Sequence, residues 1–193
     1  MISKLVDELD ELDLKIIHQL QKNGRASMTE LSEKVASSRQ TVTNRLKKLI
    51  DEGLVLVRGG LDIMKLDYKI ADVGLEVRGE DTRRRVEKLL KECPRVLDIF
   101  KTPEKANFHL RVWGEDDKTI NSTIESFGDI SNVDIIYTHY LGTPIHGNIT
   151  INIDPNRQDT APCGKICTEC YRYHNAWCFG CPITTDYKSP LIE

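Results

Sequence analysis

The sequence predicts an α+β protein with an N-terminal winged helix-turn-helix, a ferredoxin-like βαββαβ middle domain and a short cysteine-rich C-terminal module. Apolar residues recur with the helical period of about 3.6 residues as far as residue 53. Strand-like and helical patterns then alternate in the order βαββαβ up to residue 141. Five of the six cysteines fall between residues 163 and 181. We therefore expect domains at residues 1–60, 61–153 and 154–193.

Three short helices are predicted in the N-terminal part. Asp10, Ser27 and Ser38 are placed to cap them, and Glu30 has the spacing that completes a capping box with Ser27. Gly53 ends the third helix, since glycine tolerates the left-handed conformation that closes a helix. Residues 54–57 are apolar and precede a pair of glycines, so they are expected to form the wing strand before its turn.

The third helix has a polar face without acidic residues. The net charge is −3, yet residues 39–48 contain four basic residues and no acid. Arginine and amide side chains pair with base edges, and lysine binds phosphate. A solvated helical face is the alternative interpretation, but three helices with this turn favour contact with the major groove of double-stranded DNA. The predicted contact residues are Ser38, Arg39, Gln40, Thr41, Thr43, Asn44, Arg45, Lys47 and Lys48.

The middle domain is predicted from residues 70–141. Strands are expected near residues 71–78, 96–101, 107–113 and 133–141, with helices opening at Asp81 and at Asp116 or Asp117. The last strand is apolar on both faces, which suggests that a second subunit covers the face that the helices leave open. We expect one face to carry Val133, Ile135, Tyr137 and Leu141, and the other Ile136 and Tyr140. A homodimer or higher homo-oligomer would also pair the DNA-binding helices.

The composition is that of a soluble intracellular protein. Hydrophobic residues make up 39% of the chain and charged residues 30%. No apolar run reaches the roughly 20 residues that cross a bilayer. The N-terminus also lacks the apolar core of a signal peptide. We therefore expect a cytoplasmic location and no membrane partner.

Residues 9–146 resemble the leucine-responsive (Lrp/AsnC) family. The resemblance rests on an ordered set of motifs: Leu9-Asp10-x-x-Asp13-x-x-Ile16-Ile17, Asn23-Gly24-Arg25, Glu30-Leu31, and Arg45-Leu46-Lys47-Lys48-Leu49-x-x-x-Gly53-Leu54-Val55. It implies a transcription regulator in which a DNA-binding domain precedes an effector and oligomerisation domain.

One stretch departs from the family pattern. Where members typically carry Gly-x-aromatic-Asp, close to the small-molecule pocket of relatives that bind amino acids, this chain has Ala106-Asn107-Phe108-His109. Alanine restricts the backbone, and histidine replaces an obligate acceptor with a switchable donor. The change argues against a free amino acid as the effector at Ala106, Asn107 and His109. His109 is either a pH- or ligand-sensing residue or a strand histidine with satisfied hydrogen bonds.

The C-terminal cysteines follow a polar, proline-containing linker. Such a cluster in an intracellular protein indicates metal or redox chemistry rather than disulfides. Two C-x-x-C pairs can supply the four thiolates that zinc prefers. The C-x3-C-x2-C spacing and the proline after the last cysteine are also typical of iron–sulfur ligation, and thiolates bind copper(I) well. The predicted metal ligands are Cys163, Cys167, Cys170, Cys178 and Cys181.

Three further residues affect which side chains could hold a metal ion. Cys163 and His174 lie outside the two C-x-x-C pairs and can replace a ligand, stay free or bind a second metal. Cys93 stands alone and is expected to pack as a small apolar residue. The module is similar in placement to the cysteine-rich tails of some archaeal Lrp-like copper regulators, although its spacing differs from theirs.

Together these features predict a sequence-specific DNA-binding transcription regulator that responds to metal or redox state through its tail. One alternative is a regulator in which zinc only holds the tail together. Another is a redox or electron-transfer protein built on the cysteines. The chain has no dinucleotide-binding glycine motif, no P-loop and no nucleophile signature, so we expect it not to be an enzyme.

Overall fold

The computed structural model describes residues 9–145, 147, 149–152 and 156–188, and only the backbone of Met64. By its internal contacts the chain divides into two compact units, Met1–Arg58 and Gly59–Glu193. The cysteine-rich module therefore groups with the ferredoxin-like domain. No helix within the described ranges is long and apolar enough to cross a membrane.

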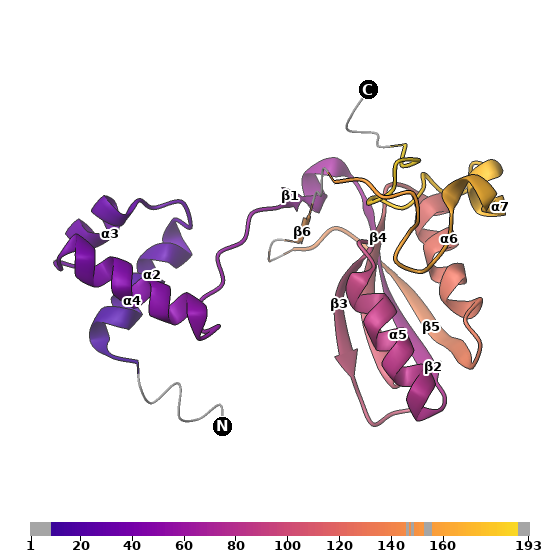
Figure 1. The fold of residues 1–193 in the computed structure, drawn as a ribbon, viewed down its shortest axis with the longest axis horizontal. Coiled ribbons are helices and arrows are strands. Elements are labelled where there is room, and N and C mark those ends of the chain that lie inside the picture. The colour runs from indigo at the N-terminus through magenta and orange to yellow at the C-terminus, as the bar shows by residue number, and fades with distance from the viewer. Residues whose placement is uncertain (1–8, 146, 148, 153–155, 189–193) are drawn as a thin grey trace. The chain divides into compact units, whose positions relative to one another are not determined.

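The first unit contains the three predicted helices, α2 (Glu11–Lys22), α3 (Met28–Lys34) and α4 (Arg39–Asp51) (Figure 1). Their shared core is apolar, with Ile16, Leu31 and Val42 fully buried. The caps form as predicted, and Asp10 makes a reciprocal capping box with Asp13. Each cap satisfies backbone N–H groups that the first turn of a helix leaves unpaired.

The wing strand expected at residues 54–57 is wrong. This segment has no regular secondary structure, and among the described residues no strand pairs with it. Val55 packs against the helical core while Leu56 is 66% exposed. Pairing begins only at β1 (Leu61–Asp62), which joins β6 (Thr150–Ile151) in a two-stranded sheet. An apolar run becomes a strand only where a partner supplies the backbone hydrogen bonds.

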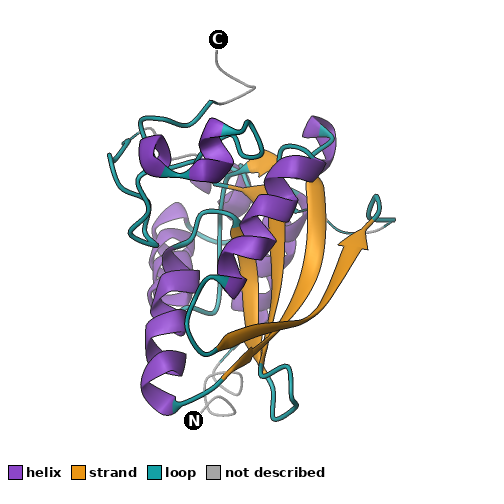
Figure 2. Cartoon of the chain, turned by 90° about the vertical axis from the view of Figure 1, so that its right-hand side faces the viewer, coloured by secondary structure: helices purple, strands orange, loops and turns teal. Residues whose placement is uncertain are grey.

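The second unit has the predicted βαββαβ order. Four antiparallel strands lie in the order β3-β4-β2-β5. Both long helices cover one face of this sheet (Figures 1 and 2). The bounds are β2 (Lys69–Val77), α5 (Glu80–Glu92), β3 (Val96–Lys101), β4 (Phe108–Gly114), α6 (Asp117–Gly128) and β5 (Val133–Leu141).

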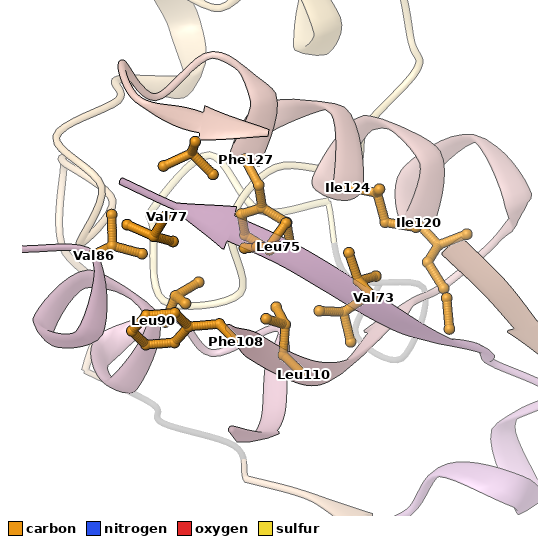
Figure 3. Packing of buried hydrophobic residues seen from close by; sticks show 13 residues of the cluster. Val73, Leu75, Val77, Val86, Leu90, Phe108, Leu110, Ile120, Ile124 and Phe127 are labelled. Atoms are coloured by element: carbon orange, nitrogen blue, oxygen red, sulfur yellow. The ribbon is translucent and has the colours of Figure 1, made fainter. Parts of the chain in front are cut away.

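The main core lies between the helices and the sheet. Val73, Leu75 and Val77 point from β2 toward the helices, where they meet Leu90 of α5 and Phe127 of α6 (Figure 3). Alternate residues of β2 supply this layer, as the predicted two-residue period requires. The core therefore fixes which face of the sheet stays open.

A bulge between β2 and β5 changes the alternation of the last strand. Tyr137 pairs with Gly74, but the next residue of β2, Leu75, pairs with Ile135. Ile136 is the extra residue that this shift inserts. One inserted residue moves every side chain beyond it to the opposite face of the sheet.

The bulge makes the predicted faces of β5 wrong. Val133 and Ile135 belong to the core on the helix side. Tyr137 and Leu141 instead pair with β2 residues of the open face. Tyr140 lies on the helix side of the sheet, because it pairs with the buried Ala71. The open face therefore carries Tyr137 and Leu141 from β5, whereas Val133 and Ile135 face the helices.

The tail packs against α6. It contains a 3-10 turn (Cys167–Glu169) and the short helix α7 (Tyr171–His174), which lies beside α6 in Figure 1. The Ser122 hydroxyl of α6 donates to the Trp177 carbonyl at 2.7 Å. Arg172 of α7 donates to both carboxylate oxygens of Asp129 at 2.8 and 3.3 Å. The module is therefore attached to the ferredoxin-like domain by several polar contacts.

Candidate DNA-binding surface and cysteine-lined cavity

The exposed face of α4 presents polar and basic side chains. Arg39, Gln40, Thr43, Asn44 and Lys47 are all exposed and recur at the spacing of one helical face. The Gln40 amide donates to the Asn44 carbonyl oxygen at 3.0 Å. This leaves the Gln40 oxygen and the Asn44 amino group without a partner in the described part of the chain. One acceptor and one donor are thus available to base edges.

The first turn of α4 is held by its cap. Ser38 accepts a hydrogen bond from the Thr41 backbone N–H at 3.1 Å, and the two hydroxyls are 2.7 Å apart. Both residues are exposed. The cap orients the N-terminal turn, so Ser38 and Thr41 have a structural role in addition to their predicted contact with DNA.

Arg45 connects two helices. Its guanidinium lies 2.8 Å from the Asp10 carboxylate and 3.2 Å from that of Asp13, whose side chain is only 5% exposed. Hydrogen bonding to the Asp13 N–H and the charge of Arg45 lower the pKa of Asp10. Arg45 therefore attaches α4 to the start of α2, a role that the sequence did not predict.

The remaining basic residues of α4 differ in whether they form an ion pair. Lys48 lies 3.7 Å from Glu52 in an exposed ion pair, which contributes little to stability. Neither Arg39 nor Lys47 belongs to an ion pair among the described residues. These two cations are accordingly the better candidates for contact with phosphate.

The predicted effector segment is largely engaged in holding the sheet. The Asn107 side chain bonds the backbone N–H and carbonyl of Val77 at 2.9 and 3.1 Å. The His109 ring lies between the Thr102 hydroxyl, 3.1 Å from Nε2, and the Tyr137 hydroxyl, 2.5 Å from Nδ1. Ala106 is buried. These contacts favour a strand histidine with satisfied hydrogen bonds.

His109 also borders a hollow of about 380 Å3 on the open face of the sheet. Asp72, Asp98 and Arg111 line the same hollow. The Arg111 guanidinium pairs with Asp98 through two nitrogens. The hollow therefore combines a histidine, an ion pair and a second carboxylate.

The cysteines line one cavity of about 280 Å3. Its wall includes the five tail cysteines and also Cys93, which follows the last turn of α5. Apolar residues such as Leu89, Phe127 and Ile130 fill much of the remaining wall. The tail therefore brings its thiols to a residue of the ferredoxin-like domain 70 positions before Cys163, which the sequence alone did not indicate. The cysteines are Cys93, Cys163, Cys167, Cys170, Cys178 and Cys181.

The six cysteines are free thiols. Burial raises the pKa of Cys93 and Cys178, and it raises the pKa of Cys181 to about 12. A thiol with a raised pKa is mostly protonated near neutral pH and is therefore a poor nucleophile. These three residues are thus poorly suited to nucleophilic catalysis.

The predicted four-thiolate zinc centre is not assembled. Within the described residues, no three His, Cys, Asp or Glu side chains are arranged to hold a metal ion. His174 is exposed, and its Nε2 lies 2.5 Å from the Thr168 carbonyl oxygen. It does not belong to the cavity wall. Zinc binding therefore remains a prediction.

A buried ion pair joins the cysteine loop to the sheet. The Arg95 guanidinium contacts Glu115 through two hydrogen bonds of 2.8 and 3.2 Å, and it donates to the Gly180 carbonyl at 2.6 Å. Tyr187 donates to the same Glu115. Gly180 lies between Cys178 and Cys181, so this network positions the second C-x-x-C loop. The sequence does not reveal this pair, because charged residues next to a strand are normally solvated.

Asp129 is the second attachment point of the tail, and we expect its ionisation to affect the stability of the fold at low pH. Hydrogen bonds from Arg172 and from Lys165 lower its pKa to about 2. A carboxylate with a depressed folded-state pKa stabilises the fold above its unfolded pKa of 3.8 and loses that contribution as the pH falls toward 2. As the pH falls from about 4 to 2, we therefore expect the free energy of unfolding to decrease less in the Asp129→Asn variant than in the parent chain.

Tryptophan fluorescence during urea unfolding measures this effect, because Trp113 and Trp177 both lie in the second unit. The matched control is Asp159→Asn, which changes an exposed tail carboxylate. Equal pH dependence in the Asp129→Asn and parent chains would contradict the assigned role of Asp129.

Comparison with known proteins links both units to regulators of transcription. A family model described as winged helix-turn-helix DNA-binding matches residues 9–55. A proline dehydrogenase transcriptional activator of Rhizobium radiobacter is 41% identical over 106 residues, which are 54% of this chain and 65% of that protein, slightly less than two thirds of its length.

Two further matches span more of the compared protein. The Bkd operon transcriptional regulator of Pseudomonas aeruginosa is 31% identical over 54% of this chain and 71% of its own length. The structure of Bacillus subtilis LrpC superimposes with a TM-score of 0.62 and 25% identity. That match covers 72% of this chain and 98% of LrpC, so 28% of this chain lies outside it.

Proposed function

Because this chain belongs to the Lrp/AsnC family of transcription regulators, we propose that it is a sequence-specific DNA-binding regulator that acts as a homo-oligomer and responds to the state of its cysteines. The exposed face of α4 is the observation that carries the DNA-binding part. It combines an amide pair with two cations that form no ion pair with any residue that the structure describes, and it has no acidic residue between positions 39 and 48.

Affinity and specificity arise from different residues of this face. Arg39 and Lys47 supply charge for phosphates, an interaction that releases counterions and weakens as salt rises. Gln40 and Asn44 supply a donor and an acceptor of the kind that read adenine. Arg45 contributes by holding α4 against α2, through its contacts with Asp10 and Asp13.

The proposed oligomer forms through the open face of the sheet. This face carries Tyr137, Leu141 and the 58%-exposed Phe100 next to charged residues. A second copy that covered it would remove these side chains from water, and paired α4 helices would then meet two half-sites. The cysteine-lined cavity supports the proposed response to the state of the cysteines, because the tail thiols and Cys93 of the ferredoxin-like domain line the same cavity.

Two substitutions on α4 test the proposal. Lys47→Ala is expected to weaken binding to all DNA sequences and to reduce the slope of log K against log salt by about 1, since one phosphate contact is lost. Gln40→Ala is expected to reduce discrimination at one base pair by about 1–3 kcal/mol while leaving that slope unchanged. Fluorescence anisotropy with operator and random duplexes over a salt series measures both effects.

The matched control is Lys34→Ala, which removes an exposed cation from the last turn of α3. Sedimentation of the same samples reports the oligomeric state. Unchanged binding by both α4 variants would contradict the assigned face, and a monomer at the binding concentrations would contradict the oligomer.

A further inference from the structure

We propose that the cysteine-lined cavity binds a four-iron iron–sulfur cluster through Cys163, Cys167, Cys170 and Cys181. The inference deepens the proposed function, on which it rests for its effect on DNA binding, but cluster binding itself is independent of that function. Three observations carry it: the cavity, the spacing of its thiols and the surroundings of Cys181.

The first observation is the cavity, because a single tetrahedral ion needs none. Four thiolates close directly around zinc. Here six thiols line a cavity of about 280 Å3. Thiols on the wall of a common cavity suit a ligand with several metal atoms, because each sulfur then binds a different iron.

The second observation is the spacing of the thiols. Cys163, Cys167 and Cys170 form a C-x3-C-x2-C run, while Cys181 is followed directly by Pro182. A run of three close cysteines with a fourth elsewhere in the chain is one of the spacings that hold iron–sulfur clusters, and a proline directly follows the last cysteine of bacterial ferredoxin runs. The fold brings the distant cysteine back to the run.

The third observation distinguishes Cys181 from Cys178. The Cys181 backbone N–H donates to the Cys167 sulfur at 3.5 Å, which places Cys181 next to a member of the C-x3-C-x2-C run. At the Cys178 sulfur the hydrogen bonds are local, from the Gly180 N–H at 3.4 Å and to the Gly180 carbonyl at 3.9 Å. The structure therefore favours Cys181 as the fourth ligand. N–H groups that point at sulfur also stabilise the negative charge of a thiolate-bound cluster.

Basic and apolar side chains both line the wall. Arg95 is paired with Glu115, and Lys165 and Arg172 share Asp129, so these carboxylates offset part of the positive charge that an anionic cluster would meet there. Assembly of the cluster from equal amounts of ferrous and ferric iron and from sulfide is a ligand exchange without net oxidation. Each of the four thiols gives up its proton to the solvent as its sulfur binds iron, and the iron oxidation states do not change.

The full chain, prepared anaerobically and incubated with equal amounts of ferrous and ferric iron and with sulfide, tests the proposal. After removal of unbound ions, we expect about four irons and four sulfides per chain and the broad visible absorption of thiolate-bound iron. One zinc per chain in a protein that takes up no iron would overturn the proposal, as would a protein that binds neither metal.

Serine variants test the ligand set. Cys163→Ser and Cys181→Ser are expected to lose most of the iron, whereas Cys178→Ser and the matched control His174→Ala retain it. Loss of iron from Cys178→Ser with retention by Cys163→Ser would overturn the assignment in favour of the two C-x-x-C pairs. Circular dichroism of the metal-free variants shows whether each chain folds. If Cys181→Ser does not fold, Cys163→Ala provides a second test of the ligand set, because Cys163 is exposed.

DNA binding separates this inference from the proposed function. Iron and sulfide are measured without DNA, so a chain that binds the cluster but has the same operator affinity with and without it would contradict only the proposed response. A chain that binds its operator and takes up no iron would overturn only the cluster.

Discussion

Glu115→Ala is expected to lower the free energy of unfolding of the second unit by about 3–5 kcal/mol, the usual cost of leaving one partner of a buried ion pair uncompensated. The Arg95 and Glu115 side chains are only 5% and 2% exposed. Without Glu115, the guanidinium keeps the Gly180 carbonyl and the Trp113 ring, 5.0 Å away, but it has no counter-charge. Urea unfolding of the metal-free chain at fixed concentration, followed by tryptophan fluorescence, measures the loss.

The tail provides a second readout. Tyr187 and Gly180 both contact the Arg95–Glu115 pair, so Glu115→Ala is also expected to increase the rate at which a protease cuts the tail. The matched control is Glu125→Ala, which removes a 62%-exposed carboxylate 3.7 Å from Arg172. An exposed pair contributes at most about 1 kcal/mol.

A double variant tests the cause of this loss. Arg95→Met with Glu115→Leu replaces the buried pair by apolar side chains, and such replacements are often neutral or stabilising. We expect the double variant to recover much of the stability that Glu115→Ala loses. A loss below about 1 kcal/mol in Glu115→Ala would contradict the importance assigned to the pair.

Gly114→Ala is expected to cost about 1–3 kcal/mol or more, because it overpacks the junction between β4 and α6. A Cβ atom at Gly114 would lie 2.6 Å from the backbone nitrogen of Ile120 and 2.8 Å from its Cα. These atoms belong to the first turn of α6, so the helix itself has to move. The same urea unfolding experiment measures the effect.

Gly128→Ala is the matched control at the other end of α6. Its Cβ would lie 3.6 Å from the nearest side-chain atom, Cδ1 of Ile135, which is an ordinary contact. Alanine also restricts the unfolded chain, so this variant is expected to be neutral or to stabilise the protein by about 0.4–1 kcal/mol. Equal stability of the two variants would show that the junction accommodates a methyl group.

The helices of the first unit were predictable because their signals are local. Asp10, Ser27 and Ser38 cap helices by hydrogen bonds that span three residues, so the short segment around each cap contains what the cap requires. The βαββαβ order was predictable for the same reason, since each element has its own hydrophobic period. The exposed face of α4 follows directly from that period.

The errors occur where the outcome depends on a distant partner. The wing strand needed a neighbouring strand, and none lies beside residues 54–57 in the part of the chain that the structure describes. The faces of β5 depended on a bulge opposite Gly74, which only the pairing of two strands 60 residues apart reveals. Arg45 is predicted from the sequence as a DNA contact, and its ion pairs with Asp10 and Asp13 appear only when α2 and α4 pack together.

The cysteine-rich tail shows the same division. The sequence by itself determined that five thiols are concentrated near the C-terminus and that they are spaced for metal ligation. Only the tertiary structure placed Cys93 on the same cavity wall, attached the loop to Arg95 and Glu115, and brought Cys181 next to Cys167. Spacing along the chain determines local turns, whereas the approach of distant thiols depends on the burial and pairing of the whole domain.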